Sequence, residues 1–561
     1  MKSDILLKKN RDIKSLKMMK LITFYIALLV FAVLNQGCES LLDADSDRRV
    51  FPDENKPDSP NDAIYSMSGI FSKLEKIADR YVLLGELRGD LMDVTEFANP
   101  NLKEIYNFDV SQDNPYNNIN DYYSVINNCN YLIRNIDTAI VIGAEKVLYR
   151  TFAAAKAIRA WTYLQIALNY GRVKYYENPI LTVKDTGNYM EYSIRELLPV
   201  LIQDLEPWKH MDEPESFSLG IDLSSDELYF PVRFVLGDLY LWNGDYEKAA
   251  IEYHDLIEEN SYVIDEFSQS TWTVDNGVFV ERDPQNQYWL NMFYLSSREQ
   301  ITLIAGSTEY GLGADLDSLS LYRFEITPSA ISIKNWDDQV YYYNANVYNQ
   351  GDLRGDYGSY LSSEYSLGDI SAAYNFILKY YLMSVNTSKA IIVYRNGLLY
   401  LRYAEAVNRT GKPNLAFAVL KYGMNSETLD VDTIVPRNEK YSDYTDTSGT
   451  FYNYVDFENT DFDDNLGVHA RGCGNTNLAT GYKILPQSSL LDSVLYVEDK
   501  IVEELALETA FEGNRFHDLM RIAFRRNDPA YLANKVSEKY INNKEAIRSK
   551  LMTESNWYLL P

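Results

Sequence analysis

"FVLGDLYLWNGDYEKAAIEYHDLI", residues 234–257, has the pattern of two helices joined by a tight turn. The small side chains of Gly237 and Ala249 would let two antiparallel helices approach closely, and Gly244 with Asp245 would form the turn. This stretch therefore predicts a helical hairpin within a mainly α-helical fold.

The spacing within this hairpin is typical of a tetratricopeptide unit. The pattern L-G-x2-Y…A-x3-F is matched by Leu236, Gly237, Tyr240, Ala249 and Tyr253, with Arg233 in place of the usual Trp. A second copy, "LRYAEAVNRTGKPNLAFAVLK" (residues 401–421), places Ala404, Val407, Gly411, Ala416 and Leu420 at the same spacing. Because the copies are far apart in sequence, we expect separate helical pairs and not a tandem array.

Long irregular inserts separate the expected helices. Residues 61–74 predict a helix capped by Ser59 or Asn61, and residues 146–171 predict a helix that stops at Gly171. The inserts cover residues about 262–390 and 428–485, and "DQVYYYNANVYN" (residues 338–349) in the first predicts short strands. Long inserts of this kind are usually functional.

The N-terminal region has the pattern of an export signal. "LITFYIALLVFAVL" (residues 21–34) is uncharged and follows three lysines, but it is shorter than the roughly 20 residues of a spanning helix. We expect a lipoprotein signal peptide at residues 1–37, starting at Met1, Met18 or Met19, then a lipid anchor on Cys38 and an acidic tether at residues 38–60. Residues 61–561 would form a single domain. An ordinary signal peptide with an incidental Cys38 is the alternative.

Composition excludes several functions. A net charge of −28 argues against binding to nucleic acid and against a basic membrane patch. Beyond Cys38, only Cys129 and Cys473 remain, so either one disulfide or two buried thiols would form.

Few residues suggest a metal or a catalytic centre. The four histidines lack metal-ligand spacing, and no nucleophile or phosphate-binding motif occurs. Asp461, Asp463 and Asp464 offer weak calcium ligands, but no bidentate Glu follows at loop spacing, so a solvated loop is favoured. We expect no cofactor, with calcium as the alternative, and no enzymatic activity.

"EELALETAFEGNRFHDLMRIAF", residues 503–524, concentrates charge near the C-terminus. Glu508 and Glu512 would share a helix face, Gly513 would end the helix, and Arg515 could then reach back to a carboxylate. Asp518 and Arg521 have the i,i+3 spacing of an ion pair. Acid–base chemistry is the alternative, but we expect a structural ion-pair network that clamps the last helices.

Three motifs together resemble the SusD/RagB family of surface lipoproteins. They are the segment just described, "AAAKAIRAWTYLQIALNYG" (residues 153–171) and "LLYLRYAEAVNRTG" (residues 398–411). The sequence departs from the family pattern at Lys174, Leu505 and Thr509. The resemblance implies a SusD-like scaffold on the outer membrane that binds oligomeric nutrients and delivers them to a SusC-like TonB-dependent transporter.

Ligand-binding residues must be chosen from chemistry alone. Sugar rings stack on aromatic faces and carboxylates accept hydroxyl donors, so polar and aromatic residues of the loops are candidates. These are Asp90, Asp93, Phe97, Trp272, Trp289, Trp336, Tyr341 and Tyr342. Oligosaccharides are the first choice of ligand and oligopeptides the second; a surface glycan hydrolase or its accessory module is the third reading.

Overall fold

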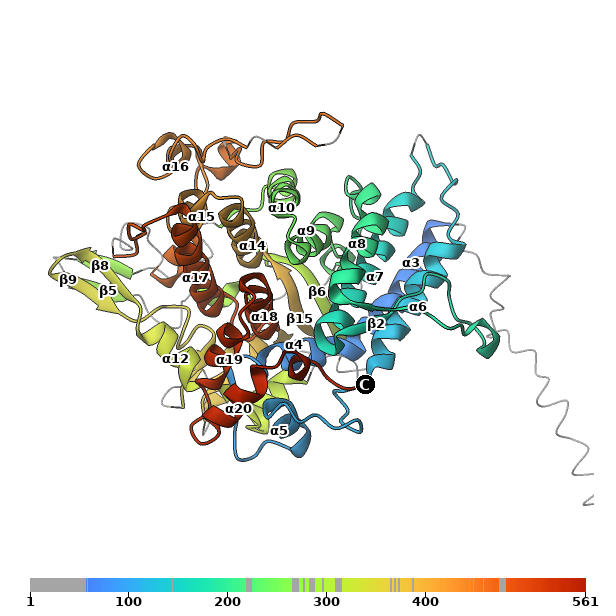
Figure 1. The fold of residues 1–561 in the computed structure, drawn as a ribbon, viewed down its shortest axis with the longest axis horizontal. Helices are drawn as coiled ribbons and strands as arrows, with labels where there is room; N and C mark the ends of the chain where they lie inside the picture. Colours follow the sequence, from blue (N-terminus) through green and yellow to red (C-terminus); the bar gives the residue numbers. More distant parts are fainter. Residues whose placement is uncertain are drawn as a thin grey trace, which may run out of the picture. The chain divides into compact units, whose positions relative to one another are not determined.

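Helices dominate the fold, and short strands lie between them (Figure 1). The computed structural model describes residues 57 and 59–561, apart from residues 144, 218–223, 265–271, 276–277, 282–287, 295–296, 308–314, 364–365, 368–369, 372–373, 386–387, 443, 447, 458 and 474–480. The expected signal peptide, Cys38 and most of the expected tether lie outside these residues. Among the helices described, none is both long enough and apolar enough to cross a membrane.

Local signals set the ends of several helices. Ser59 caps α3 (Pro60–Leu74), because its hydroxyl accepts a hydrogen bond from the Asp62 backbone N–H at 3.3 Å. α7 (Leu148–Tyr170) ends at Gly171, whose φ of +73° is the left-handed conformation that glycine adopts without strain. Both boundaries confirm the sequence prediction.

The N-terminal half is a series of helices in which neighbours along the chain pack together. α6 packs against α7, α7 against α8, α8 against α9 and α9 against α10 (Figure 1). The remaining bounds are α4 (Ala78–Glu86), α5 (Pro100–Tyr106), α6 (Ile119–Asn135), α8 (Ile194–Leu205), α9 (Val232–Asn243) and α10 (Tyr246–Asn260).

The two tetratricopeptide-like pairs are α9–α10 and α14 (Asn396–Arg409)–α15 (Pro413–Lys421). A Cβ added to Gly237 would lie 2.5 Å from the Tyr253 ring, so the close approach of α9 and α10 requires glycine there. α10 also packs against α14, which makes the two pairs neighbours despite their separation in sequence. The prediction of helical pairs is confirmed.

The C-terminal helices close the fold against its first helices. They are α16 (Ser426–Asp430), α17 (Leu490–Glu508), α18 (Arg515–Arg526), α19 (Pro529–Ser537) and α20 (Lys544–Leu551). α17 packs against α14 and α15, whereas α18 packs against α4.

The segments between these helices hold the strands and three short helices, α11 (Tyr288–Asn291), α12 (Ala330–Asp337) and α13 (Leu378–Leu382). A three-stranded antiparallel sheet has the order β14 (Ser384–Val385), β15 (Ser388–Arg395), β6 (Gln300–Ser307). The other strands form antiparallel pairs: β1 (Met92–Val94) with β7 (Ile326–Pro328), β2 (Arg172–Lys174) with β3 (Glu191–Ser193), β4 (Trp272–Asp275) with β5 (Val278–Glu281), β8 (Val340–Asn344) with β9 (Val347–Gln350), β10 (Tyr360–Leu361) with β13 (Phe376–Ile377), and β11 (Ser366–Leu367) with β12 (Ile370–Ser371). The strands expected at residues 338–349 are the β8–β9 hairpin.

One large apolar core runs through the helices, and a small second core joins the two inserts. The second core contains Trp272, Tyr341, Leu353 and Cys473. Cys129 is a free thiol in the main core, so it forms no disulfide with Cys473. Burial raises the pKa of the Cys129 thiol to about 12.

Candidate functional site

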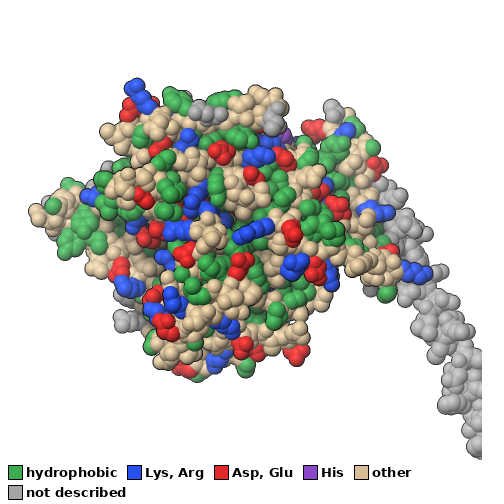
Figure 2. Space-filling view, in the orientation of Figure 1, with side chains coloured by type: hydrophobic (Ala, Val, Ile, Leu, Met, Phe, Trp, Pro, Cys, Tyr) green, Lys and Arg blue, Asp and Glu red, His purple; other side chains and the backbone are tan. Residues whose placement is uncertain are grey.

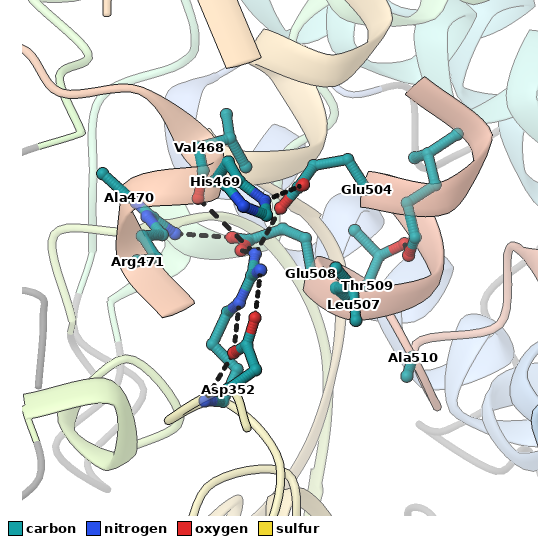
Figure 3. A network of polar contacts seen from close by, with 12 residues as sticks. Asp352, Val468, His469, Ala470, Arg471, Glu504, Leu507, Glu508, Thr509 and Ala510 are labelled. Carbon is teal, nitrogen blue, oxygen red and sulfur yellow. Dashed lines mark hydrogen bonds and ion pairs between the residues drawn. The ribbon is translucent and has the colours of Figure 1, made fainter. Parts of the chain in front are cut away.

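A buried network of ion pairs holds the end of α17 against both inserts (Figure 3). We call it the ion-pair cluster. Its members are Glu299, Asp352, Arg354, Lys379, Arg395, His469, Arg471, Glu504, Glu508 and Glu512.

Glu508 lies at the centre of the ion-pair cluster. Its carboxylate accepts hydrogen bonds from Arg471 at 2.6 Å, Arg395 at 2.7 Å and Arg354 at 3.0 Å. Burial alone would raise the pKa of Glu508, but the three guanidinium groups outweigh burial and hold that pKa well below its usual range. Glu508 is therefore a permanent anion that neutralises the arginines around it.

Glu504 and Glu512 extend the cluster to either side of Glu508. Glu504 pairs with Arg354 at 2.5 Å and with His469 Nδ1 at 2.8 Å, while Asp352 holds the opposite edge of the same guanidinium (Figure 3). Glu512 pairs with Arg395 at 2.8 Å and with Lys379 at 2.6 Å. Arg354 and Arg471 come from the inserts and Arg395 from the end of β15, whereas the carboxylates come mostly from the C-terminal segment, so the cluster fixes the inserts to the scaffold.

The rest of the charged segment makes separate pairs. Arg515 reaches Asp90 through two hydrogen bonds of 2.6 and 2.9 Å. Asp518 and Arg521 form the i,i+3 pair expected from their spacing, at 2.9 Å, and Arg521 also holds Glu405. Asp90 is thus committed to a buried ion pair and is not the ligand group that the sequence suggested.

Four of the aromatic candidates are also buried. Trp289 and Tyr341 are 0% exposed, Trp336 is 1% exposed and Trp272 is 3% exposed. Trp336 donates to the Leu507 carbonyl at 3.2 Å and stacks on Tyr360, so it is part of the core beside α17. The expectation that these rings form a ligand platform is wrong in this structure. Trp289 and Trp336 join the main core, whereas Trp272 and Tyr341 form the small second core, so a lack of helical periodicity did not mean exposure.

Phe97, Asp93 and Tyr342 are the candidates that reach the surface. Phe97 is 53% exposed, and Asp93 and Tyr342 are partly exposed. Tyr342 lies on the β8–β9 hairpin with its ring centroid 5.6 Å from that of Tyr348. The structure does not bring Tyr342 and Phe97 together in any contact that it describes.

Phe97 instead belongs to an aromatic group with two residues of the first insert. Its ring centroid lies 5.5 Å from that of Tyr374, which in turn lies 5.5 Å from that of Phe324. Phe324 and Tyr374 are both partly exposed. We call Phe97, Phe324 and Tyr374 the aromatic surface cluster.

Backbone pairing positions the aromatic surface cluster. β1 and β7 pair just before Phe97 and just after Phe324, and the Thr95 N–H donates to the Glu325 carbonyl at 3.1 Å. The Thr95 hydroxyl also donates to the carbonyl of Phe324. Phe324 has a φ of +53°, a strained conformation for an aromatic residue that these hydrogen bonds hold in place.

Polar groups accompany these rings. The Tyr374 hydroxyl donates to the Glu96 carboxylate at 3.0 Å, and this hydrogen bond raises the pKa of Tyr374. Asn99 donates to Glu325 at 2.5 Å beside them. Exposed ring faces with a carboxylate nearby can stack on a sugar or another flat apolar face and accept its hydrogen bonds. Sequence reasoning missed Phe324 and Tyr374, because tertiary contacts between distant segments, among them the β1–β7 pairing, bring them to Phe97.

The calcium candidates do not converge. Asp461, Asp463 and Asp464 are exposed, and Asp461 accepts a hydrogen bond from Ser261 at 2.7 Å. In the described part of the chain, no group of three or more His, Cys, Asp or Glu side chains is arranged to hold a metal ion.

Comparison with known proteins gives matches only among solved structures. No family model matches the sequence, and no curated protein matches it. Surface glycan-binding protein A from Bacteroides uniformis is similar with a TM-score of 0.56 and 15% identity, over 89% of this chain and 96% of that chain. A SusD superfamily protein from Bacteroides thetaiotaomicron VPI-5482 has a TM-score of 0.55 and 16% identity, over 89% of this chain and 98% of that chain.

A SusD superfamily protein from Bacteroides vulgatus ATCC 8482 agrees, with a TM-score of 0.54 and 14% identity over 83% of this chain and 89% of that chain. Identities this low establish the fold and no more. The helical pairs, the inserts and these matches together show that the chain has the SusD-like fold.

Proposed function

We propose that this protein is a cell-surface lipoprotein that binds oligosaccharides and delivers them to a TonB-dependent outer-membrane transporter. The observation that carries the proposal is the aromatic surface cluster, in which an exposed Phe97 and the partly exposed Phe324 and Tyr374 lie together on a SusD-like scaffold. One structure of the same fold is a surface glycan-binding protein, which supports the choice of ligand.

The chemistry of the aromatic surface cluster suits capture and release. The C–H faces of sugar rings pack on Phe97 and Tyr374, while Glu96 offers an acceptor for hydroxyl groups. A shallow platform of this kind gives modest affinity, which favours transfer to a second protein. On the face seen in Figure 2, basic and acidic side chains are interspersed and form no broad basic patch. The net charge of −28 disfavours a polyanionic ligand.

Binding without catalysis fits the carboxylates of the C-terminal segment. A glycoside hydrolase needs one carboxylic acid with a raised pKa to protonate the leaving group. In the ion-pair cluster the guanidinium groups outweigh burial and lower the pKa values of Glu504, Glu508 and Glu512. These residues are therefore unsuited to act as the acid.

Calorimetric titration of the mature chain with defined oligosaccharides and oligopeptides tests the proposal. We expect at least one oligosaccharide to bind without turnover, and Phe97→Ala or Tyr374→Ala to weaken that binding about tenfold, roughly 1.4 kcal/mol. Tyr65→Ala is the control, because Tyr65 is an exposed aromatic residue on α3 outside the cluster.

Three outcomes would redirect the proposal. Binding of oligopeptides alone, with the same dependence on Phe97 and Tyr374, would replace the ligand class. Parent-like oligosaccharide affinity in both cluster variants would remove the site. Release of shorter products from a bound oligosaccharide would instead support a hydrolase.

A further inference from the structure

A small cavity between α8, α9 and α18 is lined by arginine and aromatic side chains. Its volume is about 340 Å³, and among the described residues that line it none is aspartate or glutamate. The cationic and aromatic lining residues are Arg195, Trp242, Tyr246, Arg521, Phe524 and Arg525. No member of the aromatic surface cluster lines this cavity, so it is a separate place on the molecule.

Each of the three arginines faces an aromatic ring. The distances from guanidinium carbon to ring centroid are 5.4 Å for Arg521 with Trp242, 5.2 Å for Arg525 with Tyr246 and 5.7 Å for Arg195 with Phe524. All three are cation–π distances. The ring centroids of Trp242 and Phe524 lie 6.4 Å apart, so α9 and α18 meet at this cavity through their aromatic side chains.

Two of the arginines are already neutralised by carboxylates. Arg521 donates to Glu405 through hydrogen bonds of 2.9 and 2.7 Å, and Arg525 donates to Glu498 at 2.6 Å. Both arginines belong to a network of five arginines and five carboxylates, which are Arg402, Arg409, Arg521, Arg525 and Arg526 with Asp238, Glu405, Glu498, Asp499 and Asp518. With all ten groups ionised, the charges of this network balance.

Arg195 is the cation that this balance leaves over. Its side chain is exposed in the first turn of α8, and it forms no ion pair with any described residue. Glu196 beside it is held by Ser193, whose N–H and hydroxyl donate to that carboxylate at 2.8 and 2.7 Å. Because α8 and α10 begin beside the cavity and α9 ends there, the partial charges of the helix ends largely offset one another. The cavity therefore keeps one positive charge in a chain whose net charge is −28.

We propose that this cavity binds a small ring ligand with a single carboxylate, of which a uronic acid is the model. The guanidinium of Arg195 has the planar fork of donors that matches the two oxygens of a carboxylate. Partly exposed Trp242 and Phe524 offer apolar faces to the ring of the ligand. The volume lies at the lower end of small-molecule sites, which suits one ring.

The charge of the site selects a monoanion. One carboxylate neutralises the one positive charge left over, whereas a phosphate dianion would leave an excess of negative charge. The net charge of the chain does not prevent binding of a single carboxylate, because charges beyond about 8 Å are largely screened at physiological salt. The inference goes beyond the proposed function, since stacking of neutral sugars on the aromatic surface cluster requires no anion site.

Calorimetric titration of the mature chain with four probes tests the chemistry of the ligand. Glucuronate carries the carboxylate, glucose lacks it, the methyl ester of glucuronic acid masks it, and glucose 6-phosphate carries a phosphate in its place. We expect glucuronate to bind saturably and the other three to bind at least about tenfold more weakly. Glucose, the ester or the phosphate binding as tightly as glucuronate, or no saturable binding of glucuronate, would overturn the proposal.

Matched arginine variants test the place of binding. Arg195→Gln removes the unpaired charge from an exposed side chain, and we expect it to weaken glucuronate binding about tenfold. Arg298→Gln is the control, because Arg298 is also exposed and forms no ion pair with any described residue, but lines a different cavity. Glucuronate affinity that falls equally in both variants, or in neither, would overturn the site.

Cross-tests separate this inference from the proposed function. Phe97→Ala should leave glucuronate binding unchanged, and Arg195→Gln should leave the binding of a neutral oligosaccharide unchanged. Weaker glucuronate binding in Phe97→Ala would show that the carboxylate binds at the aromatic surface cluster, and would overturn a separate site. Failure of every neutral oligosaccharide to bind would remove the proposed function and leave this inference standing.

Discussion

Glu508 is surrounded by guanidinium groups from distant parts of the chain. Arg471, Arg395 and Arg354 lie 37, 113 and 154 positions away from it. The sequence predicted the local Asp518–Arg521 pair, because i,i+3 spacing on a helix brings two side chains together. It could not predict the partners of Glu508, because no local rule says which arginine of an insert will fold back onto α17.

Substitution of Glu508 should therefore be costly. In Glu508→Gln, a neutral amide replaces the anion and leaves buried guanidinium groups without full compensation, so we expect a loss of about 3–5 kcal/mol in the free energy of unfolding. Urea denaturation measures this loss. Glu503→Gln, on the same helix but in the exposed pair with Lys500, should cost less than about 1 kcal/mol. Equal losses in the two variants would contradict the role given to Glu508.

The free energy of unfolding should also depend on pH through the carboxylate of Glu508. The folded-state pKa of Glu508 lies below the ordinary value of 4.5 that it regains on unfolding. Its contribution is therefore present above about pH 4.5 and is lost as the pH falls toward the folded-state value. The parent should lose stability with acid more steeply than Glu508→Gln over that interval.

At the scale of elements, the turn between α17 and α18 is set by a glycine that the sequence identified. Gly513 has a φ of +93°, and a Cβ there would lie 2.8 Å from the Tyr81 ring. Its N–H donates to the carboxylate of Glu86 at 2.8 Å, which ties the turn to α4. The sequence predicted one helix that carries Glu508 and Glu512 on a shared face and ends at Gly513, but α17 already ends at Glu508, so Glu512 and Gly513 lie in the turn before α18. The contact of this turn with α4 was not predictable, because it joins segments far apart in sequence.

Alanine at this turn should be destabilising. We expect Gly513→Ala to lower the free energy of unfolding by more than about 2 kcal/mol, because it adds both backbone strain and a clash. Gly69→Ala is the matched control: Gly69 lies within α3 and an added Cβ would meet no atom within 4 Å, so alanine should stabilise by up to about 1 kcal/mol. A drop in melting temperature of the same size in both variants would contradict this account.

A buried lysine holds the segment that leads to the aromatic surface cluster. Lys539, beyond the end of α19, donates to the carbonyls of Leu87 at 2.7 Å and Met92 at 2.8 Å. Because Arg515 holds Asp90 between those two carbonyls, the chain from α4 to β1 is fixed at three points. β1 then sets the position of Phe97 through its pairing with β7.

Removing the ammonium group of Lys539 should loosen the aromatic surface cluster, although Lys539 is not a member of it. We expect Lys539→Met to speed amide hydrogen exchange over residues 88–97 and to weaken oligosaccharide binding several-fold, since Phe97 is held less firmly. Lys544→Met, at the exposed Lys544–Glu538 pair, should change neither quantity. Parent-like exchange over residues 88–97 in Lys539→Met would remove the positioning role.

For the whole molecule, the helical scaffold was predictable and the aromatic surface cluster was not. The spacing of small and apolar residues predicted α9–α10 and α14–α15, because close helix packing needs those residues wherever it occurs. Aromatic residues in the inserts carried no such information, since Trp336 fills a core and Phe97 faces solvent. The pairing of β1 with β7 brings the segment of Phe97 beside that of Phe324, which no local pattern predicts.

The proposed anchor and partner give the prediction for the intact molecule. Several acyl chains on Cys38 would hold the protein on the bilayer and raise its effective concentration near a membrane transporter. We therefore expect the parent to copurify from native membranes in mild detergent with a TonB-dependent transporter. Recovery of the parent alone under several detergents would contradict the partnership.

A single substitution separates the anchor from the rest of the molecule. Cys38→Ala should abolish labelling with fatty acid and move the chain to the soluble fraction, so that recovery with the transporter falls as well. Cys129→Ala, which removes a buried thiol from α6, should still be labelled and should stay on the membrane. Display of Cys38→Ala on the surface of intact cells would show that another feature anchors the protein. Loss of labelling with undiminished recovery of the transporter would instead show that the folded domain binds its partner without help from the lipid.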